Sequence, residues 1–176
     1  MKTFHKQAKL IKLQILLFTI FSSLVFTAQS VYAEKVATLK DVKGDVRIFA
    51  PGKTRGLKGR DGMALFTETR IVTTNDDSHA NIIYNVGTRV RLMPNSELVL
   101  ATPEPGDKDS LRVKVELLAG KFFGKVNKLR ATDTFEIKTP TSTAGIKGTF
   151  FSVEAKNGET TVLVKEGLVE VANNIE

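Results

Sequence analysis

The sequence predicts an all-β domain, and three features lead to this prediction. From Lys35 onward, short runs of Val, Ile, Leu, Phe and Thr alternate with polar residues, which is the period of a half-buried strand. Gly, Asn, Asp or Pro recurs between these runs, as expected at turns. Beyond residue 34, no window of twelve or more residues has the apolar spacing of an amphipathic helix. We therefore expect a sandwich, a barrel or a solenoid of short strands.

The N-terminus has the features of a secretory signal. Four lysines and no acid occupy the first twelve residues, and an apolar stretch follows over Leu13–Ala28. Val31-Tyr32-Ala33 supplies the small residues that signal peptidase accepts, so we expect residues 1–33 to be a signal peptide cleaved after Ala33. The protein is then periplasmic or secreted and keeps no stable membrane span. The alternative is an uncleaved anchor, although a run of 16 residues is short of the roughly 20 that span a bilayer.

The remaining chain, residues 34–176, is predicted to be one domain of about ten short strands. Nine runs carry the strand pattern, in this order: Val42–Ile48, Ala80–Tyr84, Arg89–Leu92, Glu97–Leu100, Arg112–Leu118, Phe135–Thr139, Thr149–Ala155, Thr160–Lys165 and Leu168–Ala172.

Turn chemistry separates these runs. Asn157-Gly158 is the strongest short signal for a β-hairpin, because both residues adopt positive φ easily. Asn85–Thr88 and Glu166-Gly167 are predicted to be further tight reversals. Pro103–Asp109 is polar and contains two prolines, so we expect an exposed loop there.

Charge and cysteine content exclude several functions. Four of the 26 basic residues lie in the leader, which leaves 22 basic against 19 acidic residues, a net charge of +3 with no run of like charges. We therefore expect no nucleic-acid partner. Cysteine is absent, so the domain has no disulfide, no thiolate metal site and no lipoprotein anchor.

Read in order, residues 44–171 resemble the FecR domain family. The landmarks that carry the resemblance are Gly44–Val46, Leu57–Gly59, Thr69–Thr73, Ser78–Ile82, Val86–Leu98, Leu117–Lys121, Phe135–Pro140, Gly148–Val153 and Thr161–Val171. The resemblance implies an all-β extracytoplasmic module, a twisted solenoid-like or sandwich-like stack of short strands, with no known catalytic site.

The sequence departs from the sigma-factor regulators of that family. Those proteins resemble a three-part assembly with a cytoplasmic helical segment, a membrane span and a docking domain after the FecR domain. Here twelve residues precede the apolar stretch, and the sequence ends at Glu176. We expect a stand-alone secreted FecR domain and do not carry over sigma-factor regulation.

The stretch Thr139–Thr149 crowds hydroxyls and glycines around one lysine. Gly145 and Gly148 could present backbone amides to an anion, with Lys147 and Thr149 completing the site. However, the spacing is not that of a phosphate-binding loop, and no helix follows. We favour a structural corner in which the glycines allow unusual backbone geometry.

Two pairs of adjacent phenylalanines, Phe122-Phe123 and Phe150-Phe151, form a second candidate site. One ring of each pair must face outward if both pairs lie in strands. Outward rings that cluster would form a patch for a partner or a glycan. The alternative, which we favour, is a second packed face.

Catalysis and metal binding have little support in the sequence. The expected mature chain has a single histidine, His79, in a polar turn, and the acidic pairs Asp76-Asp77 and Asp107/Asp109 lie in loops where nothing would raise a carboxyl pKa. These oxygen-rich loops lack the spacing of calcium sites. We expect no enzyme activity, no metal and no cofactor.

The leading hypothesis is thus a non-catalytic binding or scaffolding module of the bacterial cell envelope, with an envelope protein or polysaccharide as its partner. One alternative is a membrane-tethered signalling component whose signal is not cleaved. Another is a protein that binds or modifies envelope polysaccharide.

Overall fold

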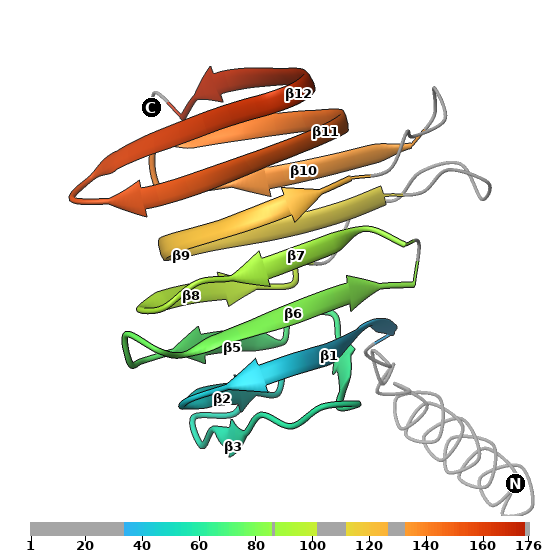
Figure 1. The fold of residues 1–176 in the computed structure, drawn as a ribbon, viewed down its shortest axis with the longest axis vertical. Coiled ribbons are helices and arrows are strands. Elements are labelled where there is room, and N and C mark those ends of the chain that lie inside the picture. Colours follow the sequence, from blue (N-terminus) through green and yellow to red (C-terminus); the bar gives the residue numbers. More distant parts are fainter. Residues whose placement is uncertain (1–33, 86, 102–111, 127–132, 175–176) are drawn as a thin grey trace, which may run out of the picture. The chain divides into compact units, whose positions relative to one another are not determined.

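The computed structural model describes residues 34–85, 87–101, 112–126 and 133–174, and every regular element in these ranges is a β-strand (Figure 1). The twelve strands are β1 (Lys35–Lys43), β2 (Val46–Phe49), β3 (Leu57–Lys58), β4 (Ala64–Phe66), β5 (Arg70–Thr73), β6 (His79–Tyr84), β7 (Arg89–Leu92), β8 (Ser96–Val99), β9 (Arg112–Lys125), β10 (Thr134–Lys138), β11 (Ser142–Lys156) and β12 (Glu159–Asn173). The all-β prediction is confirmed.

All twelve strands are hydrogen-bonded into one sheet that doubles over on itself. In the view of Figure 1, β1, β6 and β7 lie in a front layer, and β2, β5 and β8 lie in a back layer. β9 belongs to both layers, because its N-terminal part pairs with β8 and its C-terminal part pairs with β7. The domain is sandwich-like in its two layers and solenoid-like in the strands that run through both.

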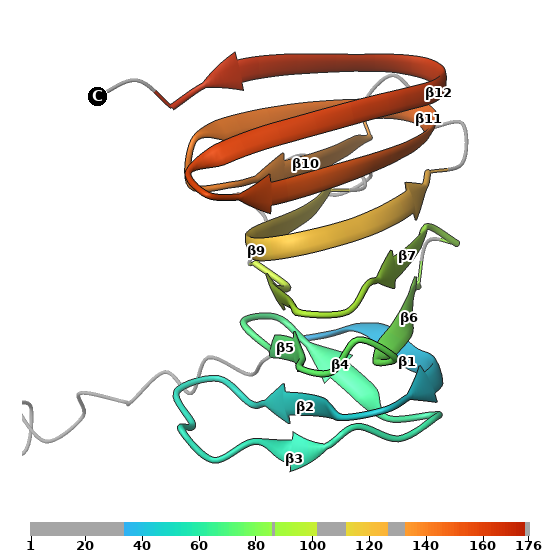
Figure 2. The same cartoon turned by 60° about the vertical axis from the view of Figure 1, so that its left-hand side comes forward.

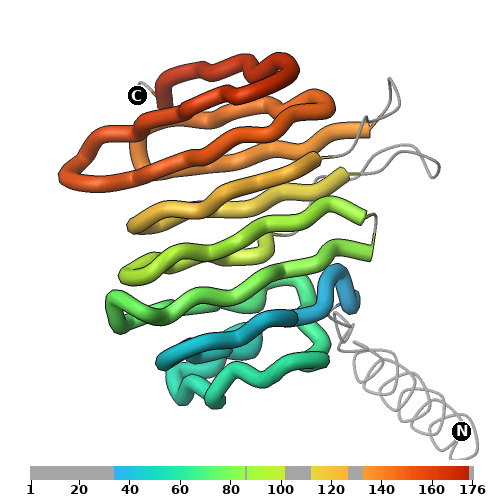
Figure 3. The backbone as a smooth tube through the Cα atoms, in the orientation of Figure 1, coloured from blue at the N-terminus to red at the C-terminus, as the bar shows by residue number. Residues whose placement is uncertain are grey.

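Three long strands cross from one layer to the other, and each bends at a glycine. Figure 3 shows the chain turning at the side edges of the stack. The corner glycines are Gly120 in β9, Gly148 in β11 and Gly167 in β12, with φ of 85°, 61° and 98°. L-residues with a side chain rarely adopt this region, so glycine is the residue that lets a strand change layers.

Hydroxyl groups satisfy backbone atoms where the sheet turns. The Ser78 hydroxyl accepts hydrogen bonds from the amides of Asp45 and Asn75, at 2.9 and 3.2 Å. The Ser96 hydroxyl accepts a hydrogen bond from the Lys121 amide at 2.8 Å. Both serines are buried, and a buried amide without a partner would cost about 1–3 kcal/mol.

Each crossing also shifts the alternation of buried side chains by one residue. Val115 and Leu117 face the core in the back part of β9, whereas Phe122 does so after the corner at Gly120. In a strand without a corner, odd-numbered residues would have stayed inside throughout. The core between the layers is accordingly continuous, and its largest members are Phe122, Phe135, Phe151, Leu39, Leu65, Ile71, Ile82, Leu92, Leu98, Leu100, Leu117 and Ile137.

The structure corrects three local predictions. Val42–Ile48 is not one strand, because the chain changes layers at Gly44, where φ is 71°. Glu166-Gly167 is not a reversal, because β12 continues through it as a bend. Ser142–Lys147, expected to be part of a corner, forms the first half of β11 and pairs with β10.

Two turn predictions have different outcomes. The hairpin at Asn157-Gly158 is confirmed, since Lys156 pairs with Glu159 and both turn residues have positive φ, 54° and 76°. The loop Pro103–Asp109 lies outside the described residues.

We predict that Gly120→Ala lowers the free energy of unfolding by at least about 2 kcal/mol. The alanine would have to keep the positive φ of this position, and its Cβ would overlap Ser96. Gly145→Ala is the matched control. A Cβ at position 145 meets no atom within 4 Å, so its effect should stay within about 1 kcal/mol. Urea unfolding of both variants is the measurement, and equal stabilities would contradict the role assigned to the corner.

Candidate functional site

A shallow groove on the outer surface of the front layer brings aromatic and basic side chains together. Its volume is about 350 Å³, and it is lined by residues of β6, β7, β9 and β11. Phe123 and Phe150 supply its rings, and Arg89, Arg91 and Lys125 supply its cations. We call these five residues the aromatic–basic groove.

The strand register explains why these residues meet. Arg89 on β7 lies opposite Lys125 on β9, and Lys125 lies opposite Phe150 on β11. Arg91 lies opposite Phe123 in the neighbouring row. Directly opposed residues share one face of a sheet, and neighbouring strands are about 4.8 Å apart. Strands that are distant in sequence therefore build one continuous surface about 14 Å across.

The charges of the groove are only partly balanced. Arg91 lies 3.6 Å from Asp41, but the described residues place no carboxylate within ion-pair distance of Arg89 or Lys125. These two cations occupy directly opposed positions, an arrangement that destabilises a sheet. The pair therefore contributes positive potential to the groove at some cost to the fold.

Lysines on the neighbouring strand positions approach both rings of the groove. Lys121 Nζ lies 5.5 Å from the centroid of the Phe123 ring, and Lys165 Nζ lies 5.5 Å from that of Phe150. Such contacts stabilise exposed pairs modestly, by about 0.5–1 kcal/mol. Phe150 remains 40% exposed, so part of its side chain stays open to solvent beside Lys165.

The two phenylalanine pairs each place one ring inside and one outside. Phe122 and Phe151 are buried and meet edge to face, with centroids 5.9 Å apart. Phe123 is half-buried and Phe150 is exposed, and both line the same groove. The packed outer face that we favoured from the sequence does not describe this surface, and its role in binding remains a prediction.

The candidate anion site lies at the corner of β11, with its groups engaged by the protein. The Thr149 hydroxyl is within 3.0 Å of the carbonyl oxygens of Lys147 and Leu168, to which it can donate. Lys147 Nζ lies 3.8 Å from the Glu170 carboxylate. Gly148 has positive φ and forms the bend, while Gly145 lies within the strand that pairs with β10. This geometry is that of a corner.

Among the residues considered for catalysis, those that the structure describes do not form a known catalytic arrangement. His79 begins β6 and its Nε2 lies 3.7 Å from the Asp41 carboxylate. Asp76 accepts a hydrogen bond from the Asn95 side chain at 2.8 Å. Asp107 and Asp109 lie outside the described residues. Within the part of the chain that the structure describes, no three His, Cys, Asp or Glu residues are grouped as metal ligands would be.

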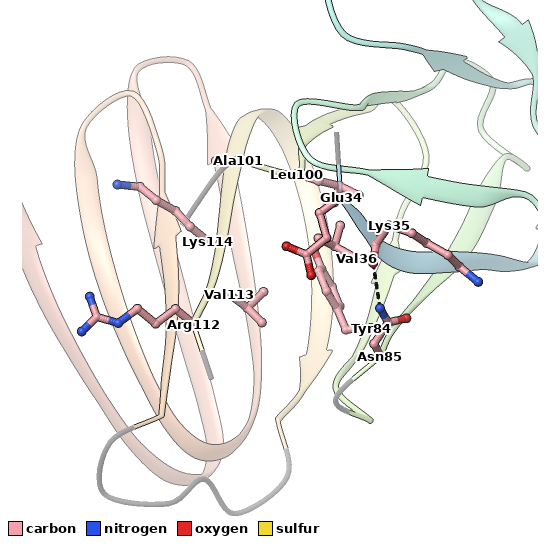
Figure 4. Close-up of a pocket in the computed structure, with 10 residues that line it drawn as sticks. All are labelled: Glu34, Lys35, Val36, Tyr84, Asn85, Leu100, Ala101, Arg112, Val113 and Lys114. Atoms are coloured by element: carbon pink, nitrogen blue, oxygen red, sulfur yellow. Dashed lines mark hydrogen bonds between the residues drawn. The ribbon is translucent and has the colours of Figure 1, made fainter. Parts of the chain in front are cut away.

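A smaller cavity lies between the ends of the layers, around Tyr84 (Figure 4). Val36 and Tyr84 come from the front layer and Leu100 and Val113 from the back, and the Asn85 side chain donates to the Lys35 carbonyl at the rim. Its volume of about 160 Å³ is below the roughly 300–1,000 Å³ of usual ligand sites. We therefore do not assign it a ligand.

Tyr84 is the unusual residue of this cavity. Its side chain is buried, and among the described residues its hydroxyl has no hydrogen-bond partner. Burial raises the pKa of the phenol far above its ordinary value, because ionisation would place a charge in the core.

The basic residues of the groove and the buried hydroxyl of Tyr84 were not identified from the sequence. Arg89 and Arg91 alternate with buried Val90, so their outward direction could have been inferred from the strand pattern. Their position beside Lys125 and Phe150 depends on the pairing of β7 with β9 and of β9 with β11, which no local pattern gives.

Comparison with known proteins places these observations in a family context. A model of the family described as FecR protein matches residues 70–170, more than half of the chain. Among curated proteins no relative matches. No helix in the described ranges is both long and apolar enough to cross a bilayer.

Two similar crystal structures from Parabacteroides distasonis are each described as a "putative anti-sigma factor". One, at 1.65 Å, has 22% identity and a TM-score of 0.48, and the other, at 2.50 Å, has 23% identity and a TM-score of 0.50. In both cases the match covers 61% of this chain and 48% of the other, so the chain spans about half of their length. The likeness at 0.50 supports a shared fold.

We predict that Tyr84→Phe leaves the domain as stable as before or stabilises it by about 1 kcal/mol, because it removes a buried hydroxyl without a described partner. Only the unfolded tyrosine ionises near its ordinary pKa of 10.0, so this residue lowers stability as the pH rises above that value. Phenylalanine does not ionise, so the Tyr84→Phe variant should not show this loss of stability at alkaline pH. Urea unfolding at neutral and alkaline pH tests both statements, and a large destabilisation at neutral pH would show that the hydroxyl is bonded.

Proposed function

Because this chain belongs to the FecR protein family, we propose that it is a non-catalytic binding module of the cell envelope, active in signalling, with an anionic ligand in the aromatic–basic groove. The observation that carries this proposal is the opposed pair Arg89 and Lys125 beside the exposed ring of Phe150. A fold gains nothing from two facing cations without a counterion, whereas an anionic ligand would gain from both.

An acidic envelope polysaccharide fits the groove best. Carboxylates can form charge-assisted hydrogen bonds with Arg89 and Arg91, and the faces of Phe123 and Phe150 can cover the apolar face of a sugar ring. The groove is open and about 14 Å across, which suits a segment of a polymer more than an enclosed small molecule. An acidic protein segment is the second candidate, favoured by the same cations.

The signalling part of the proposal rests on family membership and on the shared fold. One of the two solved structures described as anti-sigma factors reaches a TM-score of 0.50 with this chain. The chain spans about half of that protein, so whole-protein activities are not transferred. In our proposal, the groove supplies the ligand-binding event and other parts of a pathway transmit it.

We predict that the double variant Arg89→Glu/Lys125→Glu weakens binding to a carboxylated polysaccharide such as polygalacturonate by about 10- to 100-fold, since two attractive charges become repulsive. Isothermal titration calorimetry at low and high salt measures the change. Lys58→Glu/Lys138→Glu, which reverses two exposed charges on β3 and β10, away from the groove, is the matched control and should keep most of the affinity.

Phe123→Ala/Phe150→Ala separates a specific site from a diffuse electrostatic one. It should weaken binding while leaving the salt dependence of the remaining affinity unchanged. Equal binding of polygalacturonate by the control and the groove variants would contradict the proposal. Tighter binding of an acidic peptide or of single-stranded DNA would assign the groove to another ligand.

We propose, in addition, that residues 1–33 are removed on export and that the protein acts outside the cytoplasm. The sequence pattern of the leader supports this, as does the position of Glu34, whose carbonyl accepts a hydrogen bond from the Thr67 amide at 3.0 Å directly before β1.

Export makes a direct prediction about the mature chain. Mass spectrometry of the protein from the periplasm or medium should give an N-terminus at Glu34. An intact N-terminus in the membrane fraction would instead support the membrane-tethered form of the signalling hypothesis.

A further inference from the structure

The last strand of the sheet is a long edge without a described partner on one side. β12 has 15 residues and pairs only with β11, along both of its arms (Figure 2). The other edge strands, β3 and β4, have two and three residues. Short edges resist unwanted pairing, whereas a long one offers a row of free amides and carbonyls.

The hydrophobic core is open at this end of the stack. Four valines of β12 lie opposite buried residues of β11 and therefore face the interior: Val162, Val164, Val169 and Val171. Val164 and Val171 are 46% and 52% exposed, because nothing in the described chain lies beyond them. The valines of both arms thus form one apolar stripe across the end of the domain.

The opposite end of the stack is covered by the chain itself. Residues 59–63 run across it, with hydrogen bonds from the Gly59 amide to the Val46 carbonyl at 2.7 Å and from the Leu39 amide to the Met63 carbonyl at 2.9 Å. Met63 packs on the core. Stacked β architectures need such a cap at each end.

We propose that the β12 edge is the interface of a homodimer, in which β12 pairs antiparallel with β12 of a second copy. The two-fold axis passes between Glu166 and Gly167. In this register Val162 lies opposite the second copy's Val171, and Val164 lies opposite the second copy's Val169. All eight valines then face one shared core.

The bend at Gly167 makes the edge self-complementary. Inward residues are even-numbered before the bend and odd-numbered after it, so valine matches valine along both arms at once when the front arm of one copy meets the back arm of the other in antiparallel pairing. A two-fold rotation along the bisector of the bend exchanges these arms. The edge therefore fits a copy of itself without a change of backbone.

Charge on the outer face agrees with the same register. Glu170 of the second copy lies opposite Leu163, which places its carboxylate diagonal to Lys165, within reach of a long side chain. In the dimer the β12 edges of the two copies pair with each other, and only the capped ends remain unpaired. Assembly therefore stops at two copies.

The size of the stripe indicates a moderate affinity. An arm of seven residues is about 23 Å long and the two strand layers together are about 20 Å deep, so pairing buries on the order of 900 Å². This is below the standard size of specific interfaces, and the main-chain ladder adds hydrogen bonds. We expect a dissociation constant in the micromolar range.

Sedimentation velocity of the purified mature protein over a series of concentrations tests the proposal. The protein should pass from monomer to dimer, and Val164→Lys/Val171→Lys should raise the dissociation constant at least about 100-fold, because each copy would bring two charges into the shared core. Leu163→Lys, an equally exposed outward position on the same strand, is the matched control and should still dimerise. Circular dichroism checks that each variant is folded.

A disulfide experiment tests the register. The chain has no cysteine, so Val162→Cys/Val171→Cys should oxidise to a covalent dimer, whereas Val162→Cys/Val169→Cys should oxidise far more slowly. A monomer at every concentration, dimers unaffected by the two lysines, or faster cross-linking through position 169 would each overturn the proposal.

Discussion

The fold depends on satisfying the backbone where strands pass from one layer to the other. At such a corner the ladder is interrupted, and amides and carbonyls would be left unpaired beside an apolar core. Ser78, Ser96 and Thr149 place buried hydroxyls at these points, and each hydroxyl forms a hydrogen bond with a backbone amide or carbonyl of a neighbouring segment. Glycines supply the backbone angles, and hydroxyls supply the hydrogen bonds. Together they allow one sheet to form both walls of its own core.

Much of this architecture could be predicted from the sequence. Alternation and turn residues gave the strand content, and Asn157-Gly158 gave its hairpin, because both signals act over a few residues. The bends inside β11 and β12 could not be predicted, since Gly148 and Gly167 resemble ordinary turn glycines until the neighbouring strand is known.

The candidate site was harder to predict for the same reason. That one phenylalanine of each pair faces outward follows from strand geometry alone. Which one does so depends on the shift in alternation at Gly120 and Gly148, a property of the corners. The grouping of Phe150 with Arg89 depends in turn on long-range pairing through β9. Local patterns therefore identified the ingredients of the groove but not their arrangement.

The pairing of the first strand has a consequence for the order of folding during synthesis. β1 pairs with β4 at one edge and with β6 at the other, so that Leu39 meets Ile82, more than forty residues later in the chain. At about 5–20 residues per second, a ribosome needs several seconds to deliver that partner. Until that partner has been made, β4 is the only neighbour with which the first strand can pair. The sheet around β1 therefore cannot be completed before the ribosome has passed β6.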